Sequence, residues 1–194
     1  MTVVPTREDR KKLRLLAERI RSRRTTKLYL KQAVDRKLVH EAIEVARWAP
    51  NHHLTEPWHF YILGEKKIAE VVEVTRIVVT EKKGPDIGEF KAKAHGEIPG
   101  WLVVTCDRSA DELLQLEDYA SCACAIQNLM LYLSEAGVAT KWATGPVTRD
   151  QRFYDALCIE SEKAMVVGII WYGYPKITPQ QSRKDVRLIV TETV

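Results

Sequence analysis

The sequence of 194 residues lacks any uninterrupted apolar run close to the roughly 20 residues that a membrane-spanning helix requires. Its first residues, MTVVPTREDRKK, also lack the apolar core of a secretory signal. These two absences predict a soluble, cytoplasmic protein. No pair among the four cysteines has the CxxC spacing of a structural zinc site, and we therefore expect buried free thiols at Cys106, Cys122, Cys124 and Cys158.

A strong excess of one charge sign is missing as well. The 30 Lys and Arg residues against 26 Asp and Glu give a formal net charge of +4, which is too mild to indicate a nucleic-acid partner by itself. Hydrophobic residues make up 45% of the chain, enough for one sizeable core but, at this length, not for two. We expect a single domain over residues 1–194, without internal repeats or low-complexity tracts.

Apolar residues that recur every three or four positions predict helices, and short apolar or alternating runs predict strands. Residues 101–106 form an apolar run, as expected for a central strand buried on both faces. Residues 81–99 are polar and rich in glycine, which predicts a loop broken by a short helix at 87–95, of the kind that often covers a site. Together the patterns predict an α+β fold in which helices sandwich a mixed β-sheet. The other predicted helices lie at 6–21, 35–48, 66–80, 112–136 and 150–157, and the strands at 58–63, 101–106, 141–144 and 164–174.

Three short segments carry residue types suited to a ligand. The first, Arg23-Arg24-Thr25-Thr26-Lys27, places cations and hydroxyl donors just past a predicted helix. Guanidinium and hydroxyl groups are what the oxygens of a phosphate monoester accept, so the segment suits a phosphate. A solvated basic helix end that complements the helix dipole is the alternative, and on this segment alone it is the simpler one.

The second segment, residues 49–58, runs from the end of a helix into a strand. Its two prolines, Pro50 and Pro57, fix a rigid loop that can be held against a flat ligand. His52 and His53 suggest a metal site, but no third ligand stands at a suitable spacing and adjacent histidines point apart in most backbones, so we expect no metal here.

The third segment, residues 137–146, leaves a helix at Gly137 and offers the small residues Ala143, Thr144 and Gly145. Small side chains let a ligand approach the backbone closely. A strand that ends in glycine for packing reasons alone is an equally good reading.

In their order and separation these segments resemble the nitroreductase family of flavoproteins, over residues 19–174, and most of all its small, minimal members. The family's first motif is matched by Arg23, Thr25, Lys27 and Tyr29, its second by Ala49, Pro50, Pro57 and Trp58, and its third by Gly137, Trp142, Ala143, Thr144 and Gly145.

The resemblance implies an FMN-dependent oxidoreductase that carries electrons from NADH or NADPH to a nitroaromatic, quinone or similar planar acceptor by a ping-pong mechanism. It also implies a homodimer with shared sites, whose C-terminal tail, with 188–194 as a strand, is exchanged between subunits. No side chain needs to act as a catalyst, because N5 of the flavin carries the hydride. The implied FMN ligands are Arg23, Arg24, Thr25 and Arg183 for the phosphate and ribityl chain, Lys27 for the N1 and C2 edge of the ring, Pro50, Asn51 and His52 from the partner subunit, and Trp142, Ala143 and Thr144 for the N5 and O4 side.

The chain departs from the family in the second motif, where Asn51, Leu54 and Glu56 replace the Ser, Asn and Gln of many members. A carboxylate at Glu56 is unfavourable beside a flavin that gains negative charge on reduction, unless it turns away or pairs with a cation. Two alternatives stay open. One is a flavoenzyme of the same fold that removes halogen or fragments the flavin under a lid at 81–99, and the other is a basic, non-enzymatic module that binds nucleic acid through 21–31.

Overall fold

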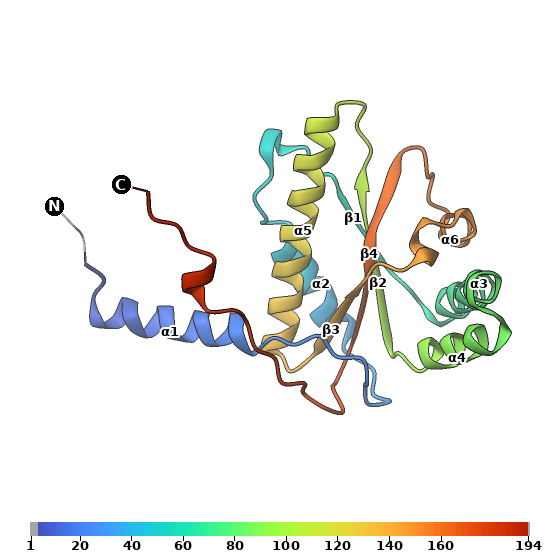
Figure 1. Cartoon of the computed structure of the whole chain (residues 1–194), viewed down its shortest axis with the longest axis horizontal. Helices are drawn as coiled ribbons and strands as arrows, with labels where there is room; N and C mark the ends of the chain where they lie inside the picture. The colour runs from blue at the N-terminus through green and yellow to red at the C-terminus, as the bar shows by residue number, and fades with distance from the viewer. Residues whose placement is uncertain (1–3, 194) are drawn as a thin grey trace.

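The computed structural model describes residues 4–193, and its centre is a four-stranded sheet in the order β1-β2-β4-β3 (Figure 1). The strands are β1 (Trp58–Ile62), β2 (Gly100–Asp107), β3 (Ala139–Ala143) and β4 (Ala164–Gly173). All three pairings are antiparallel, so the predicted mixed sheet is corrected to an antiparallel one with a single parallel bridge, Thr25–Thr140, at its edge. The predicted α+β fold is confirmed.

Helices cover both faces of the sheet (Figure 1). On one face α2 (Arg36–Ala46) and α5 (Glu112–Glu135) pack on Leu102, Val104 and Ile170. On the other face α3 (Glu65–Lys83) and α6 (Gln151–Leu157) pack on Trp101 and Ile169. Because neighbouring residues of a strand point to opposite faces, the continuous apolar run of β2 supplies both cores.

The segment predicted as a loop at 81–99 is largely helical. Helix α3 continues to Lys83, and after Gly84, with φ of 91°, the chain turns directly into α4 (Pro85–Gly96). Proline is well tolerated at a helix start because its missing N–H would have no partner there. A Cβ on Gly88 would lie 2.9 Å from the carbonyl oxygen of Arg76, so this glycine allows the two helices to touch. The predicted short helix at 87–95 is therefore confirmed, and the surrounding loop is not.

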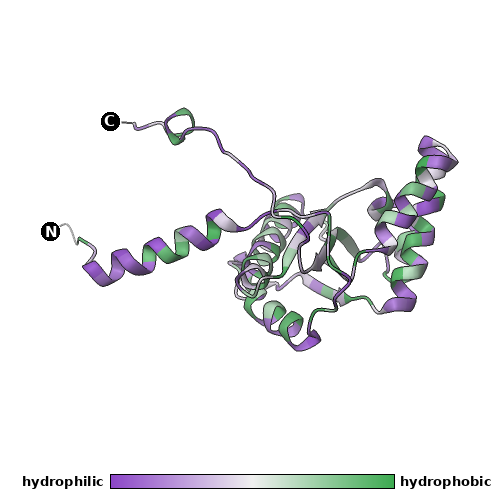
Figure 2. Ribbon diagram, turned by 90° about the horizontal axis from the view of Figure 1, so that it is seen from below, coloured by the Kyte–Doolittle hydropathy of each residue, from purple (hydrophilic) through white to green (hydrophobic). Residues whose placement is uncertain are grey.

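Both ends of the chain project from the body (Figures 1 and 2). Helix α1 (Arg7–Ser22) starts with a capping box between Thr6 and Asp9, yet it buries no residue. The tail holds a short 3-10 helix, η3 (Val186–Leu188), and residues 189–193 form no strand, which corrects the prediction for 188–193. Val194 lies outside the described residues. Apolar side chains are exposed on both ends: Leu13, Leu15, Leu16, Ile20, Ile177, Val186, Leu188, Ile189 and Val190.

The structure also bears on the expectations about the cysteines and about membrane-spanning helices. Cys106 and Cys122 are buried free thiols as predicted, whereas Cys124 and Cys158 are exposed. No helix within residues 4–193 has the length and apolar character needed to cross a membrane.

Candidate functional site

The basic segment after α1 is fixed along the edge of the sheet. Thr25 bridges Thr140 of β3, and the Thr26 N–H donates to the Thr140 carbonyl at 3.2 Å. Tyr29 is buried and its hydroxyl donates to the Thr26 carbonyl at 2.9 Å, and burial raises the pKa of this phenol. The backbone of Arg23 to Lys27 is therefore held beside the first half of β3.

Three guanidinium groups gather at this edge. Partial burial and then the neighbouring charges of Arg183 and Arg24 lower the pKa of Arg23. Arg24 donates to the backbone carbonyls of Arg21 and Arg23. None of the three guanidinium groups forms an ion pair with a carboxylate of residues 4–193. Guanidinium groups that stay charged within electrostatic range of one another repel, and a bound anion would relieve that repulsion.

The end of β3 is shaped by Trp142. Its indole Nε1 donates to the Val167 carbonyl at 3.2 Å, and a Cβ on Gly168 would collide with the indole. The indole therefore packs on the α5 side of the sheet and serves the structure. What remains for a ligand is the backbone of residues 142–145 and the small side chains of Ala143 and Thr144.

A cavity of about 350 Å³ opens on the other side of this strand end, within the size range of small-molecule sites. Its walls are residues 142–147, the inner faces of α3 and α4, and the two strand residues Ile169 and Trp171. Lys141, on β3, connects the cavity to the basic segment, because its pKa is lowered first by burial and then by the charges of Lys27 and Lys91. The remaining lining residues are Thr75, Val78, Val79, Lys82, Lys83, Lys91 and His95.

Two buried nitrogen atoms at this cavity have no hydrogen-bond partner among the described residues, Trp171 Nε1 and His95 Nδ1. Burial, followed by the charges of Lys91 and Lys141, lowers the pKa of His95 to about 4, so its imidazole is neutral at pH 7. Buried polar groups normally find partners, so these two nitrogen atoms are exceptions.

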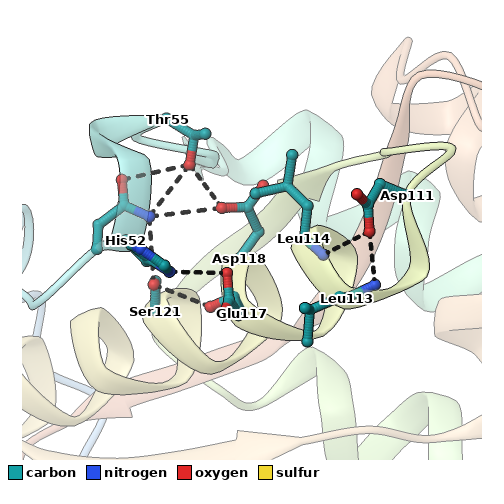
Figure 3. A network of polar contacts seen from close by, with 9 residues as sticks. His52, Thr55, Asp111, Leu113, Leu114, Glu117, Asp118 and Ser121 are labelled. Carbon is teal, nitrogen blue, oxygen red and sulfur yellow. Dashed lines mark hydrogen bonds and ion pairs between the residues drawn. The ribbon is translucent and has the colours of Figure 1, made fainter.

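The proline-bracketed loop lies elsewhere, against the first half of α5 (Figure 3). Asn51 fixes it: its side-chain oxygen accepts from the Glu56 N–H at 2.7 Å, and its amide nitrogen lies 3.3 Å from Ser121 Oγ. Thr55 Oγ1 donates to the buried carboxylate of Asp118 at 2.5 Å. The side chain of Asn51 is thus committed to holding the loop. Positive φ values at His53, Leu54 and Glu56 bend the chain sharply here.

The same loop carries Glu56, for which the sequence leaves open a cation partner, and His52 and His53, which suggest a metal site. Glu56 lies close enough to Arg47 to contribute to the raised pKa of that guanidinium, after the larger effect of Glu44, so the carboxylate has a cation in range. No third donor stands at a helical or hairpin spacing in the sequence, but the fold brings one from α5, and donor atoms of His52, His53 and Glu117 lie within 4.8 Å of one another.

The expected divergence of the two histidines is wrong, since their rings stack with centroids 3.9 Å apart and planes 15° apart. A nitrogen lone pair lies in its ring plane, and two nearly parallel planes do not converge on an ion about 2 Å from both nitrogens. The arrangement suits the His52–Glu117 contact of 3.0 Å better than a metal.

The two halves of the predicted site are far apart within one chain. The loop contacts Asp118 near the start of α5. At the other end of α5, its last residue, Glu135, forms an ion pair of 2.9 Å with Arg19 near the end of α1. Seventeen residues of helix separate these points, roughly 25 Å at 1.5 Å per residue. One mononucleotide does not reach from Arg23 to Asn51 of the same chain.

The class of protein that the structure defines is an α+β protein with guanidinium groups beside the start of an edge strand and a cavity beside its end. Comparison with known proteins gives the family. The model of the nitroreductase family matches residues 20–174. YfhC of Bacillus subtilis (strain 168), whose name places it among the NAD(P)H nitroreductases, is 30% identical over 175 residues, 88% of this chain and 89% of its own. The chain therefore belongs to the nitroreductase family, and it is an oxidoreductase of that type.

Solved structures share the fold. The nitroreductase-like family protein of Bacillus cereus superposes with a TM-score of 0.82 at 24% identity, covering 100% of this chain and 98% of that one. The FMN- and NADPH-dependent nitroreductase NfnB of Sphigopyxis sp. strain HMH gives 0.74 at 17% identity over 92% and 98%. Iodotyrosine deiodinase, bound to FMN and 3-iodo-L-tyrosine, gives 0.73 at 23% identity over 92% and 99%.

The structure thus brings some predicted residues together and separates others. Arg23, Arg24 and Arg183 form one cluster, and Trp142, Ala143 and Thr144 line the cavity. Pro50, Asn51 and His52 lie on a distant loop. Sequence reasoning missed Lys91 and His95, which lie on the short helix expected at 87–95, and Trp171, which lies near the end of β4.

Proposed function

We propose that this protein is a cytoplasmic, homodimeric FMN enzyme that oxidises NADH or NADPH and reduces a nitroaromatic, a quinone or a similar planar acceptor. The observation that carries the proposal is the cluster of Arg23, Arg24 and Arg183 beside the start of β3, with a cavity at the end of the same strand. A ligand with a phosphate at one end, a short chain in the middle and a planar ring at the other end would match this order of arginine cluster, strand and cavity. Family membership and relatives whose names include FMN and NAD(P)H support it.

The residues present fit FMN. Arg23, Arg24 and Arg183 would hold its phosphate, and Thr25, fixed by its bridge to Thr140, would stand next to the ribityl chain. Lys27 would face the edge of the ring that becomes negative on reduction, and its charge would favour the reduced form. Ala143 and Thr144 would present backbone to the opposite edge. The bound flavin would supply the redox chemistry, taking a hydride from the nicotinamide and giving two electrons to the acceptor.

Two features of the single chain support the proposed homodimer. The loop that carries Pro50, Asn51 and His52 is roughly 25 Å along α5 from the arginine cluster, so it completes the site only when a second copy supplies it. Helix α1 and the tail expose a row of apolar side chains and project from the body (Figure 2), and such surfaces mark an interface. We propose that each subunit's tail, including 188–194, lies across its partner.

Side chains in this scheme bind and orient, and none transfers a proton or attacks a substrate. The nicotinamide would leave before the acceptor enters, because one cavity of about 350 Å³ serves both in turn, which gives ping-pong kinetics. Purified protein tests the proposal directly. We expect a yellow protein with the flavin spectrum that NADPH or NADH bleaches under nitrogen, and a mass of two chains. A colourless protein that binds DNA in a salt-sensitive way would support the basic module instead.

A second candidate is reductive dehalogenation. Two observations favour it. The α3–α4 hairpin forms a wall of the cavity and covers most of the segment 81–99 that the sequence offers as a lid. The fold is also shared with iodotyrosine deiodinase. Anaerobic turnover with 3-iodotyrosine and with a nitroaromatic separates the two. Release of iodide at a rate comparable to nitro reduction would favour the second candidate, and nitro reduction alone would favour the first.

A further inference from the structure

The charged side chains that line the cavity at the end of β3 are all cationic. Four lysines line it: Lys82 and Lys83 at the end of α3, Lys91 on α4 and Lys141 on β3. No Asp or Glu is among the lining residues that the structure describes. A neutral acceptor needs no such wall, whereas an anionic one does.

The charges of these lysines are not neutralised by neighbours. None of the four forms an ion pair within residues 4–193. Lys82 is in electrostatic range of Glu81 and Asp150, but both carboxylates bind Arg152, at 2.7 and 2.8 Å. Burial lowers the pKa of Lys141, and the charges of Lys27 and Lys91 lower it further, which places Lys91 within electrostatic range of Lys141. Their repulsion disfavours the empty cavity, and an anion between them would relieve it.

The rest of the lining suits an aromatic body. Trp171 is 6% exposed and its Nε1 has no hydrogen-bond partner among the described residues. His95 packs on the same indole, with centroids 4.6 Å apart, and is neutral at pH 7. Ala143, Pro146 and Val147 add small and apolar surface. The cavity thus combines an aromatic wall and a cationic wall.

We propose that this cavity receives the electron acceptor, and that the acceptor is a planar aromatic molecule with an anionic substituent such as a carboxylate, contacted by Lys91 and Lys141. This inference rests on the proposed function and narrows its substrate class. For a nitro acceptor, the hydride of NAD(P)H and one proton together supply two electrons and two protons. One N–O bond of the nitro group breaks, the product is a nitroso compound, and the oxygen leaves as water.

The phosphates of NADPH carry the same kind of charge, so the experiment separates the two half-reactions. The flavin-containing dimer is reduced anaerobically with dithionite and mixed rapidly with 4-nitrobenzoate or with its neutral methyl ester. The variant is Lys91→Gln, and the control is Lys93→Gln, an exposed lysine of the same helix that does not line the cavity. Both positions are exposed, so neither change threatens folding.

We expect Lys91→Gln to lower the second-order rate constant for 4-nitrobenzoate by roughly threefold to tenfold, with the ester and the Lys93→Gln protein unaffected. The dissociation constant of 4-nitrobenzoate, followed by quenching of tryptophan fluorescence in the oxidised protein, should rise by the same factor. Equal losses for acid and ester, or no loss for either, would overturn the inference. So would a defect confined to reduction by NADPH, which would assign Lys91 to the nicotinamide substrate.

Failure of the proposed function would give a different experimental result from failure of this inference. A protein that takes up no flavin, or whose flavin NADH and NADPH do not reduce, would remove the proposed function and with it the acceptor. A flavin that reduces normally but reoxidises without regard to the charge of the acceptor would overturn only the present inference.

Discussion

The ammonium group of Lys141 lies 4.4 Å from the centroid of the Trp171 ring, and the imidazole of His95 packs on the same indole. The contact between cation and ring is favourable because the face of the indole is negative. Protonation of His95 would place a second cation beside Lys141 in a partly buried setting. This explains why burial and the charges of Lys91 and Lys141 together bring the pKa of His95 to about 4.

We expect the protein to lose stability as the pH falls from 6.5 towards 4. The unfolded chain takes up a proton on His95 near the ordinary pKa of 6.5, whereas the folded chain resists until about 4. In this window the unfolded state binds more protons, so acid favours unfolding. Urea unfolding at pH 7, 6 and 5 measures the effect.

The variant His95→Phe keeps an aromatic ring against Trp171 and cannot titrate. Its free energy of unfolding should fall less between pH 7 and pH 5 than that of the unaltered protein, since carboxylates contribute equally to both. Identical pH dependence in the two proteins would contradict the neutral, buried state of His95.

The contact between α3 and α4 sets the wall of the cavity, and Gly88 is the residue that permits it. A methyl group there would lie 2.9 Å from the carbonyl oxygen of Arg76 and would collide with Thr80. Because backbone cannot move aside cheaply, we expect Gly88→Ala to reduce the free energy of unfolding by about 1–3 kcal/mol.

Gly96→Ala is the matched control, because a Cβ at the last residue of α4 meets nothing within 4 Å. It should be neutral, or stabilising by up to about 1 kcal/mol through reduced backbone entropy. Chemical denaturation of both variants measures the difference, and equal effects would show that α3 and α4 do not touch at Gly88.

Helix α1 should form part of the subunit interface. Leu13, Leu16 and Ile20 share one of its faces and are each about half exposed, at 54%, 52% and 49%. We expect Leu16→Glu to convert the proposed dimer to a monomer and to release FMN, because a charge on an apolar interface carries a large desolvation cost. Light scattering after gel filtration gives the mass, and flavin absorbance gives the occupancy.

Lys11→Gln is the control for this change. It lies on the opposite face of α1 and alters the net charge of the chain by the same amount. A dimeric, yellow Leu16→Glu protein would exclude α1 from the interface.

The sequence predicts most of the elements, because their signals are local. Gly137 follows α5 with φ of 76°, and the apolar run of β2 forms an interior strand, both as expected. The loop prediction at 81–99 fails because it rests on the polar residues and glycines of the segment, which are compatible with helices here. In the structure Pro85 opens α4 and Gly88 makes a helix contact.

The site is less predictable because it depends on distance in space. Arg183 reaches Arg23 across 160 positions of sequence, and Glu117 reaches His52 across 65. Neither proximity has a local signal. The strand expected at 188–193 fails for a related reason, since a strand needs a neighbour to pair with and the single chain offers none there.

The phosphate assignment gives the sharpest prediction for the site. Arg23→Ala should weaken FMN binding by about 1.5–3 kcal/mol, the usual contribution of one hydrogen bond to a charged group, which corresponds to roughly a tenfold to 150-fold rise in Kd. Arg21→Ala is the control, an exposed arginine two residues earlier on α1. Fluorescence titration of the flavin-free protein measures both.

Riboflavin makes this test specific, because it has the same ring and ribityl chain but no phosphate. If Arg23 holds the phosphate, Arg23→Ala should weaken FMN and leave riboflavin unchanged, so the preference of the protein for FMN over riboflavin shrinks by the same factor. Arg23→Lys should fall between, since it keeps the charge but loses the two-pronged donor geometry. Equal losses for FMN and riboflavin would mean that the variant disturbs the ring site or the fold, and the arginine cluster would then have to bind a different anion.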